Sequence, residues 1–141
     1  CDFRVASDTA KIAFLFHKVG LTGADMGAAW LLQRLVGLSK ATEILMLGDF
    51  LDAKEAERIG LYHRVVSADR VLPEAQALAE RLARNPSFAQ GVTKELLTRE
   101  GSIDLATALE MESQAQALCM QDPNFRAFYE AFRAKQTAKF A

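Results

Sequence analysis

Apolar and polar residues alternate in two short stretches at the start of the chain. The stretches run from Asp2 to Ala6 and from Lys11 to Phe16, and the turn-forming residues Ser7-Asp8-Thr9 separate them. A period of two residues is typical of β-strands, because successive side chains of a strand point to opposite faces. The pattern predicts two strands that form a hairpin or lie next to each other. Since the first alternation begins directly at Cys1, without an initiating methionine, we expect further residues upstream.

A glycine-rich stretch at 20–27 follows, and beyond it the apolar spacing becomes helical. Two short helices are predicted, from Ala28 to Val36 and from Ser39 to Leu47. Each is followed by a glycine, Gly37 or Gly48, which suits the left-handed residue that ends many helices.

Asp52 is predicted to cap a further helix, with Glu55 three residues on completing a capping box and Gly60 ending the helix. Leu61 to Val66 is the one later strand that the pattern predicts, and the chain after it reads as helical. A second capping box is predicted where Ser87 precedes Gln90 by three residues.

Two more helices complete the prediction. One covers Ser102 to Met120, and the last is capped by Asp122 with Pro123 at its first position. The last helix carries an aromatic stripe at positions i, i+3, i+4 and i+7, made of Phe125, Phe128, Tyr129 and Phe132. Aromatic side chains bury ~150–250 Å² each, so we expect this stripe to dock on another subunit or on further chain.

Composition narrows the function classes. The chain has 141 residues, 50% hydrophobic and 25% charged, with net charge −1, which indicates one soluble, cytoplasmic globular unit that binds no nucleic acid. No apolar run approaches the ~18 residues that a membrane helix needs. The two cysteines, Cys1 and Cys119, are expected to be free thiols, because neither has a companion at metal-binding spacing. We expect no metal.

Several short motifs then occur in order. They are Cys1-Asp-Phe-Arg-Val-Ala-Ser, Ala10-Lys-Ile, Val19-Gly-Leu, Gln33-Arg-Leu-Val-Gly37, Ala41-Thr-Glu43, Ala53-Lys-Glu-Ala-Glu-Arg-Ile-Gly-Leu61 and Arg64-Val-Val66. Together they resemble the enoyl-CoA hydratase/isomerase (crotonase) family, most closely over residues 1–66, and the resemblance is to the C-terminal half of that family.

The resemblance implies an α/β fold, mainly α in this segment: residues 1–66 would form the C-terminal part of the crotonase ββα spiral. Residues 67–141 would form a helical oligomerisation region that builds trimers or dimers of trimers. It further implies a lyase or isomerase of fatty acid metabolism that acts on acyl-CoA thioesters and needs no cofactor besides the coenzyme A of its substrate. Because the family's two oxyanion-hole N–H donors precede Cys1, the fragment alone is expected to be catalytically incomplete.

The resemblance also directs attention to particular residues. Hydratases of the family carry a catalytic glutamate near the position of Phe16, and a phenylalanine cannot transfer a proton. Asp25 falls where the dienoyl-CoA isomerases and the 4-chlorobenzoyl-CoA dehalogenase place a catalytic aspartate, so it is the candidate acid/base or nucleophile. It could equally cap the helix from Ala28. His17 is a weaker candidate proton carrier, and the alternative is a histidine at a strand end that is hydrogen-bonded to backbone.

Candidate substrate-pocket residues are Phe14, Phe16, Gly20, Gly23 and Trp30, for which core packing is an equal explanation. Lys135 and Lys139 are weak candidates for contacts with the CoA phosphates, or simply the solvated cationic end of a helix. Three functions therefore remain open: a hydratase/isomerase, an isomerase, hydrolase or dehalogenase that uses Asp25, and a non-catalytic helical oligomerisation module.

Overall fold

The first strand pairs with the last strand, which is distant in sequence. In the computed structural model, which describes residues 1–140, β1 (Val5–Ser7) runs parallel to β4 (Arg64–Val66). The second strand, β2 (Lys11–Ile12), runs antiparallel to β3 (Leu51–Asp52), which the pattern did not predict. The predicted hairpin is therefore wrong, because each of the first two strands finds its partner some 40 or more residues further along.

The second predicted strand is also shorter than expected. It ends at Ile12, and Phe16–Val19 forms a 3₁₀ helix, η1. Gly20 ends η1 with φ of +82°, and its N–H donates to the carbonyl of His17 at 3.1 Å. The hydrophobic residues 13–16 gave the sequence a strand-like pattern. In the structure these residues belong to no strand, and η1, which begins at Phe16, contacts α2.

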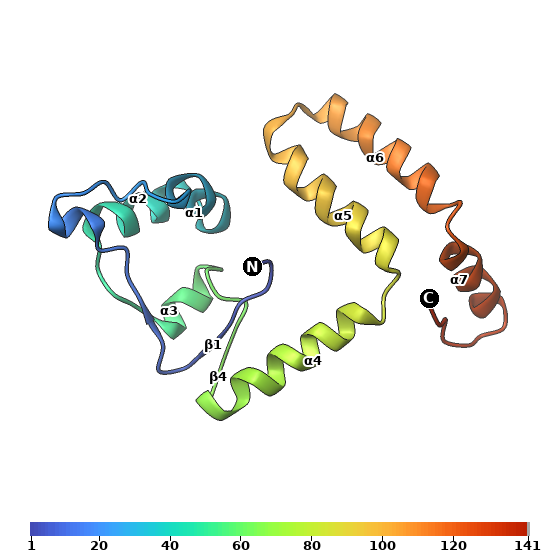
Figure 1. Cartoon of the computed structure of the whole chain (residues 1–141), viewed down its shortest axis with the longest axis horizontal. Helices are drawn as coiled ribbons and strands as arrows, with labels where there is room; N and C mark the ends of the chain where they lie inside the picture. The colour runs from blue at the N-terminus through green and yellow to red at the C-terminus, as the bar shows by residue number, and fades with distance from the viewer. Residues whose placement is uncertain (141) are drawn as a thin grey trace. The chain divides into compact units, whose positions relative to one another are not determined.

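The chain divides into two units, Cys1–Ala77 and the segment from Leu78 onward, which we call unit 1 and unit 2. Figure 1 shows the elements of both along the colour gradient. The remaining elements that begin in unit 1 are α1 (Ala28–Val36), α2 (Leu38–Leu47), α3 (Ala53–Arg58), η2 (Ala68–Arg70) and α4 (Val71–Ala83), which crosses into unit 2. The two short helices predicted after the glycine-rich stretch are thus confirmed, the second beginning one residue earlier.

The hydrophobic core of unit 1 gathers small and branched residues from its three short helices and from the bend that follows α3. It consists of Leu32, Ala41, Ile44, Ala56 and Leu61, and Phe14 is among the half-buried residues packed against it. Asp52 caps α3 as predicted, because its Oδ1 accepts from the N–H of Glu55 at 2.7 Å. The cap holds α3 where Ala53 and Ala56 are fully buried.

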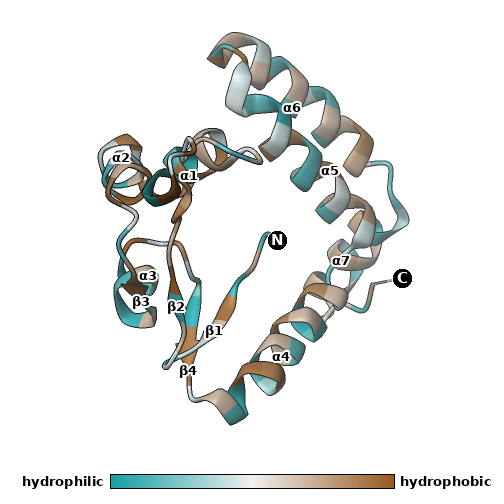
Figure 2. Ribbon diagram, turned by 60° about the vertical axis from the view of Figure 1, so that its left-hand side comes forward, coloured by the Kyte–Doolittle hydropathy of each residue, from teal (hydrophilic) through white to brown (hydrophobic). Residues whose placement is uncertain are grey.

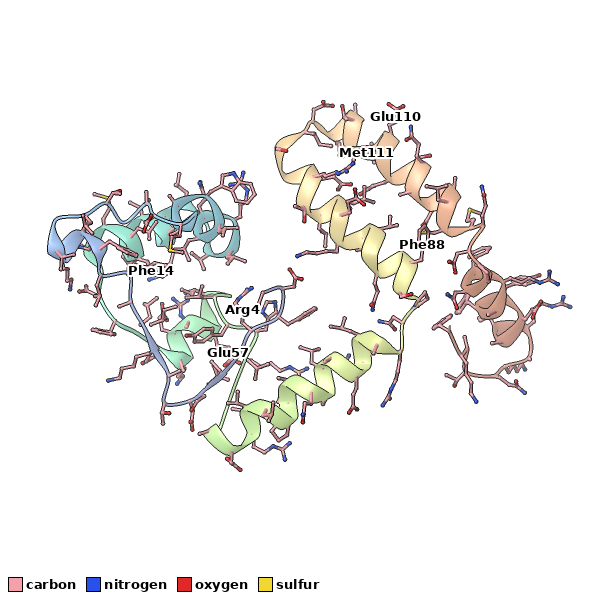
Figure 3. The ribbon with its side chains drawn as sticks, viewed as in Figure 1. Arg4, Phe14, Glu57, Phe88, Glu110 and Met111 are labelled. Carbon is pink, nitrogen blue, oxygen red and sulfur yellow. The ribbon has the colours of Figure 1, made fainter. Side chains whose placement is uncertain are left out.

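Two charged side chains of unit 1, Arg4 and Glu57, hold the segments next to its parallel strand pair (Figure 3). The guanidinium of Arg4 donates to the carbonyls of Leu61 (2.5 Å) and Cys1 (2.8 Å), so it ties the start of the chain to the turn before β4. Glu57 accepts from the N–H of Val65 at 2.8 Å. The bond from Arg4 to Leu61 joins residues 57 apart in sequence, and the bond from Val65 to Glu57 joins residues eight apart.

The secondary structure of unit 2, over its described residues, consists of helices joined by short turns and irregular segments. Its elements after α4 are α5 (Ser87–Arg99), η3 (Glu100–Ser102), α6 (Leu105–Cys119) and α7 (Pro123–Arg133). Helices α5 and α6 contact each other and run antiparallel, and both carry hydrophobic residues, drawn brown in Figure 2. No helix within residues 1–140 combines the length and the apolar character that crossing a membrane requires.

Of the two helix caps predicted in unit 2, the cap at Asp122 is confirmed and the capping box at Ser87 is not. Asp122 caps α7, accepting from the N–H of Asn124 at 2.8 Å with Pro123 in the first turn, as predicted. The capping box at Ser87 is wrong, because Pro86 takes the cap position and Gln90 donates to the carbonyl of Leu82 instead. The aromatic stripe of α7 is exposed, its members ranging from 48% exposed at Phe125 to 69% at Phe132.

Candidate active site

Asp25 lies in the loop between η1 and α1, directly before the helix. The next two residues both adopt positive φ, +49° at Met26 and +82° at Gly27. The carbonyl of Asp25 accepts from the N–H of Ala28 at 2.8 Å, which closes a turn onto α1. The cap position itself belongs to Gly27 and receives no side-chain hydrogen bond, so the alternative in which Asp25 caps this helix is wrong.

The carboxylate of Asp25 therefore does not cap α1. It is exposed, and among residues 1–140 it makes no hydrogen bond or ion pair. The nearby N-terminus of α1 presents unsatisfied backbone N–H groups, which favour negative charge in their vicinity. A carboxylate without an internal partner is available to accept a proton from a bound molecule or to donate one.

His17 lies in η1, so the expected histidine at a strand end is not found. The imidazole ring of His17 packs directly against Gly48, the residue that ends α2. A Cβ atom built on Gly48 would lie only 2.5 Å from Cε1 of His17. Its Nδ1 is buried and has no hydrogen-bond partner among the described residues. The His17 side chain makes no hydrogen bond among the described residues, so the alternative of a histidine hydrogen-bonded to backbone is also wrong. A role for His17 as a proton carrier stays a prediction.

The two predicted pocket glycines differ in their surroundings. A Cβ atom built on Gly20 would have no neighbouring atom within 4 Å. A Cβ atom built on Gly23 would lie 2.6 Å from the carbonyl oxygen of Leu45. Gly23 therefore brings the loop 20–27 against the backbone of α2. Sequence reasoning named both glycines but gave no signal for Leu45 or Gly48, because these contacts join segments that are distant along the chain.

The predicted aromatic pocket residues have different surroundings. Phe14 packs against the core of unit 1 (Figure 3), and Phe16 is half-buried in η1. Trp30 is 49% exposed on α1, and the guanidinium carbon of Arg34 lies 3.5 Å from the centre of its ring. The four-residue spacing of this cation–π pair was the signal that sequence reasoning missed. An acyl pocket built from these residues stays a prediction.

The two lysines named for CoA contacts belong to unit 2. Lys135 follows α7 with φ of +56°, and both it and Lys139 are exposed. A separate hollow of about 550 Å³ lies between α5 and α6, lined by residues such as Val92, Leu96 and Leu109. None of the predicted site residues lines this hollow. Within residues 1–140 no three His, Cys, Asp or Glu residues cluster in a way that could hold a metal ion.

Comparison with known proteins adds independent information. A sequence model of the enoyl-CoA hydratase/isomerase family matches residues 1–141. The 1,2-epoxyphenylacetyl-CoA isomerase of Escherichia coli (strain K12) is 33% identical over 139 residues, which are 99% of this chain and 53% of that protein. The short-chain-enoyl-CoA hydratase of Clostridioides difficile is 35% identical over 133 residues, 94% of this chain and 85% of that protein.

Solved structures agree on the fold. The crystal structure of a Streptomyces coelicolor A3(2) protein that is assigned as an enoyl-CoA hydratase superposes with a TM-score of 0.96 at 48% identity, over 100% of this chain and 51% of that one. The enoyl-CoA hydratase of Bacillus anthracis gives 0.93 at 29% identity, over 99% and 54%. The structural neighbours and the mainly helical chain support an α/β crotonase fold.

The length of the family match bears on the expected resemblance to the C-terminal half of the family. The family model matches the whole chain, so that match does not bear out a resemblance to the C-terminal half only. The chain nevertheless spans about half the length of several curated relatives, 53% and 54% in two of them.

Proposed function

The chain belongs to the enoyl-CoA hydratase/isomerase family, and from this premise we propose that it is part of an enzyme acting on acyl-CoA thioesters. The reaction is hydration of an enoyl group or movement of its double bond. The family match and the names of the relatives favour this chemistry over a hydrolase, a dehalogenase or a non-catalytic helical module. We expect no cofactor besides the coenzyme A that the substrate carries.

The proposed proton-transfer group is Asp25. In a double-bond shift, its carboxylate oxygen takes a proton from a carbon of the acyl group, and the electron pair moves to the thioester oxygen. The protonated carboxyl group of Asp25 then gives the proton to a different carbon as the electron pair returns from the thioester oxygen, so no atom is gained or lost. In hydration, the carboxylate would take a proton from water while the oxygen of that water bonds to the β-carbon and the electron pair of the double bond moves to the thioester oxygen. The carboxyl group would then give the proton to the α-carbon as this electron pair returns. Either task needs a carboxylate that can reach the substrate with no competing internal partner.

The observation that carries this proposal is the free carboxylate of Asp25 beside the N-terminus of α1. Phe16, at the position where the resemblance implies a hydratase glutamate, has no group that can move a proton. Asp25 is therefore the acidic side chain that the loop 20–27 offers. By the resemblance, the backbone donors to the thioester oxygen lie before Cys1. We accordingly propose that the chain corresponds to the C-terminal part of the family fold and that the 141 residues alone do not catalyse turnover.

Activity of the full-length protein tests the proposal. Hydration of crotonyl-CoA and isomerisation of a 3-enoyl-CoA would be measured for the wild type and for Asp25→Asn. Loss of a general acid/base should lower kcat by ~10²–10⁴ while the substitution preserves size and fold. Asp8→Asn is the matched control, because Asp8 is an exposed aspartate whose carboxylate accepts a hydrogen bond from the hydroxyl of its neighbour Ser7. An Asp25→Asn enzyme with wild-type kcat in both reactions would rule out this role.

A trimer, or a dimer of trimers, is the proposed assembly. The exposed aromatic stripe of α7 supports it, since four aromatic side chains on one helix face leave a large apolar area in water. The oligomer would be measured by light scattering.

A further inference from the structure

The loop that carries Asp25 touches α2 through a glycine. A side chain added at Gly23 would lie 2.6 Å from the carbonyl oxygen of Leu45 and 3.4 Å from its carbonyl carbon and its Cβ. The 2.6 Å separation from the carbonyl oxygen is too short for any residue with a Cβ, so only glycine lets the loop come this close to α2. Gly23 does not adopt a positive φ, and the close approach alone therefore requires glycine here.

A second glycine contact lies next to the first on α2. At Gly48, which ends α2 with φ of +61°, an added side chain would meet Cε1 of His17 at 2.5 Å and the carbonyl oxygen of Phe14 at 2.9 Å. The imidazole thus packs on a surface that only glycine provides, with its Nδ1 buried. The position of η1 relative to α2 is fixed by this packing.

An ion pair borders the two contacts. Lys18 Nζ lies 3.1 Å from Asp49 Oδ1, and both side chains are largely exposed, at 48% and 71%. Exposed ion pairs contribute little to stability. The contact of Gly23 with Leu45 and the contact of His17 with Gly48 therefore matter more than this ion pair for the position of the loop 20–27 and of η1.

We propose that the contacts of Gly23 with Leu45 and of His17 with Gly48 form a clamp that positions Asp25 for proton transfer. The inference rests on the proposed function, because it assigns Gly23 and His17 as positioning residues for that carboxylate. Helix α2 is a rigid reference, since Ile44 is only 3% exposed within the core of unit 1. Asp25 follows Gly23 by two residues, so a displacement of Gly23 displaces the carboxylate.

Catalysis is more sensitive than folding to the exact position of a side chain. A misplacement of about 1 Å can cost ~10²-fold in rate. A methyl group at residue 23 must move the loop away from Leu45 to remove a 2.6 Å contact. The core of unit 1 contains neither Gly23 nor Asp25, so this movement leaves the buried cluster intact.

The test combines two substitutions in the full-length enzyme. Gly23→Ala should lower kcat at least tenfold with KM changed by less than about twofold, while the circular dichroism spectrum stays that of the wild type. In an Asp25→Asn background the same substitution should have no further effect on kcat, because the group it displaces is already gone. Gly91→Ala is the matched control, since nothing lies within 4 Å of a side chain added at Gly91 and its φ is not positive.

The outcomes separate the clamp from the proposed function. Unchanged kcat in Gly23→Ala, or an equal loss in both backgrounds, would overturn the clamp. If Asp25→Asn itself keeps the wild-type kcat, the proposed function fails first, and the clamp fails with it. Should Gly23→Ala not fold, His17→Ala is measured by the same two criteria, because it empties the surface on Gly48 without adding an atom.

Discussion

Unit 1 and unit 2 contrast in how they bury hydrophobic side chains. Every buried hydrophobic residue among the described ones lies in unit 1, from Leu32 to Leu61. Unit 2 has no buried residue between 78 and 140, and its helices leave large side chains such as Leu97, Leu105 and Phe132 exposed by 69% or more. Helices that present apolar faces without covering them need a partner surface. Unit 1 is therefore organised by a core of its own, whereas the apolar helix faces of unit 2 are left uncovered among the described residues.

The largest expected effect is in the core of unit 1. Ile44→Ala should lower the free energy of unfolding by about 2–5 kcal/mol, because it removes buried methyl groups from a side chain that is 3% exposed. Urea denaturation of the full-length protein measures it, with Met46→Ala, on the exposed side of the same helix, as the control. The destabilisation should not depend on protein concentration, and a strong dependence would show that the core of unit 1 is not self-contained.

The aromatic stripe of unit 2 should respond differently. Phe132→Ala removes a ring that stacks on Phe128 at 6.0 Å and is 69% exposed. If a second copy covers the stripe, association should weaken by about 2 kcal/mol, roughly 30-fold in Kd. Sedimentation velocity over a concentration series gives the change, and Arg126→Ala on the same helix is the control. An unchanged association constant would mean that the stripe is not the contact surface.

Helix caps permit a matched comparison of the two units. Asp52 caps α3 in unit 1, and Asp104 caps α6 in unit 2, where it accepts from the N–H of Thr107 at 3.0 Å. Replacing either by alanine should cost about 1 kcal/mol, since a backbone donor loses its partner. Asp52→Ala should lower the unfolding midpoint of the whole protein, because α3 contributes Ala53 and Ala56 to the buried interior. Asp104→Ala should chiefly raise hydrogen exchange in the first turn of α6, and equal shifts in the midpoint would contradict the contrast.

The smallest expected effect concerns pH. The hydrogen-bonded guanidinium of Arg58, with help from Lys40, lowers the pKa of Glu55 from 4.5 to about 2. Because the folded protein binds this proton more weakly than the unfolded chain, the pair stabilises the fold above pH 4.5, and that contribution is lost as pH falls towards 2. Glu55→Gln should flatten the pH dependence of the urea midpoint in this window. A midpoint curve identical to that of the wild type would show that the pair contributes nothing.

Local signals in the sequence predicted local structure well. Asp52 and Asp122 were identified as caps because the donors that they satisfy lie within three residues. Long-range pairing was not predictable in the same way: β1 resembled the first arm of a hairpin, yet its partner is β4. Ser87 failed as a cap because Pro86 takes that position, a competition that the capping-box spacing does not reveal.

The candidate site shows the same difference between local features, which the sequence predicted, and long-range contacts, which it did not. Asp25 could be named from the sequence because its place before a helix and the family resemblance both depend on nearby residues. The contacts that hold its loop could not, since Leu45 and Gly48 lie more than twenty residues from Gly23 and from His17. Phe14 was taken as a possible pocket residue, and its packing against the core of unit 1 depends on elements that come later in the chain.

The most direct test of the central claim is exchange of substrate protons with deuterium in the full-length enzyme. An acyl-CoA would be incubated in D₂O with the wild type or with Asp25→Asn, and incorporation of deuterium would be followed by mass spectrometry. If Asp25 transfers the proton, the wild type labels the acyl chain and Asp25→Asn is slower by ~10²–10⁴-fold, while Asp8→Asn matches the wild type. Labelling by Asp25→Asn at the wild-type rate would contradict the account.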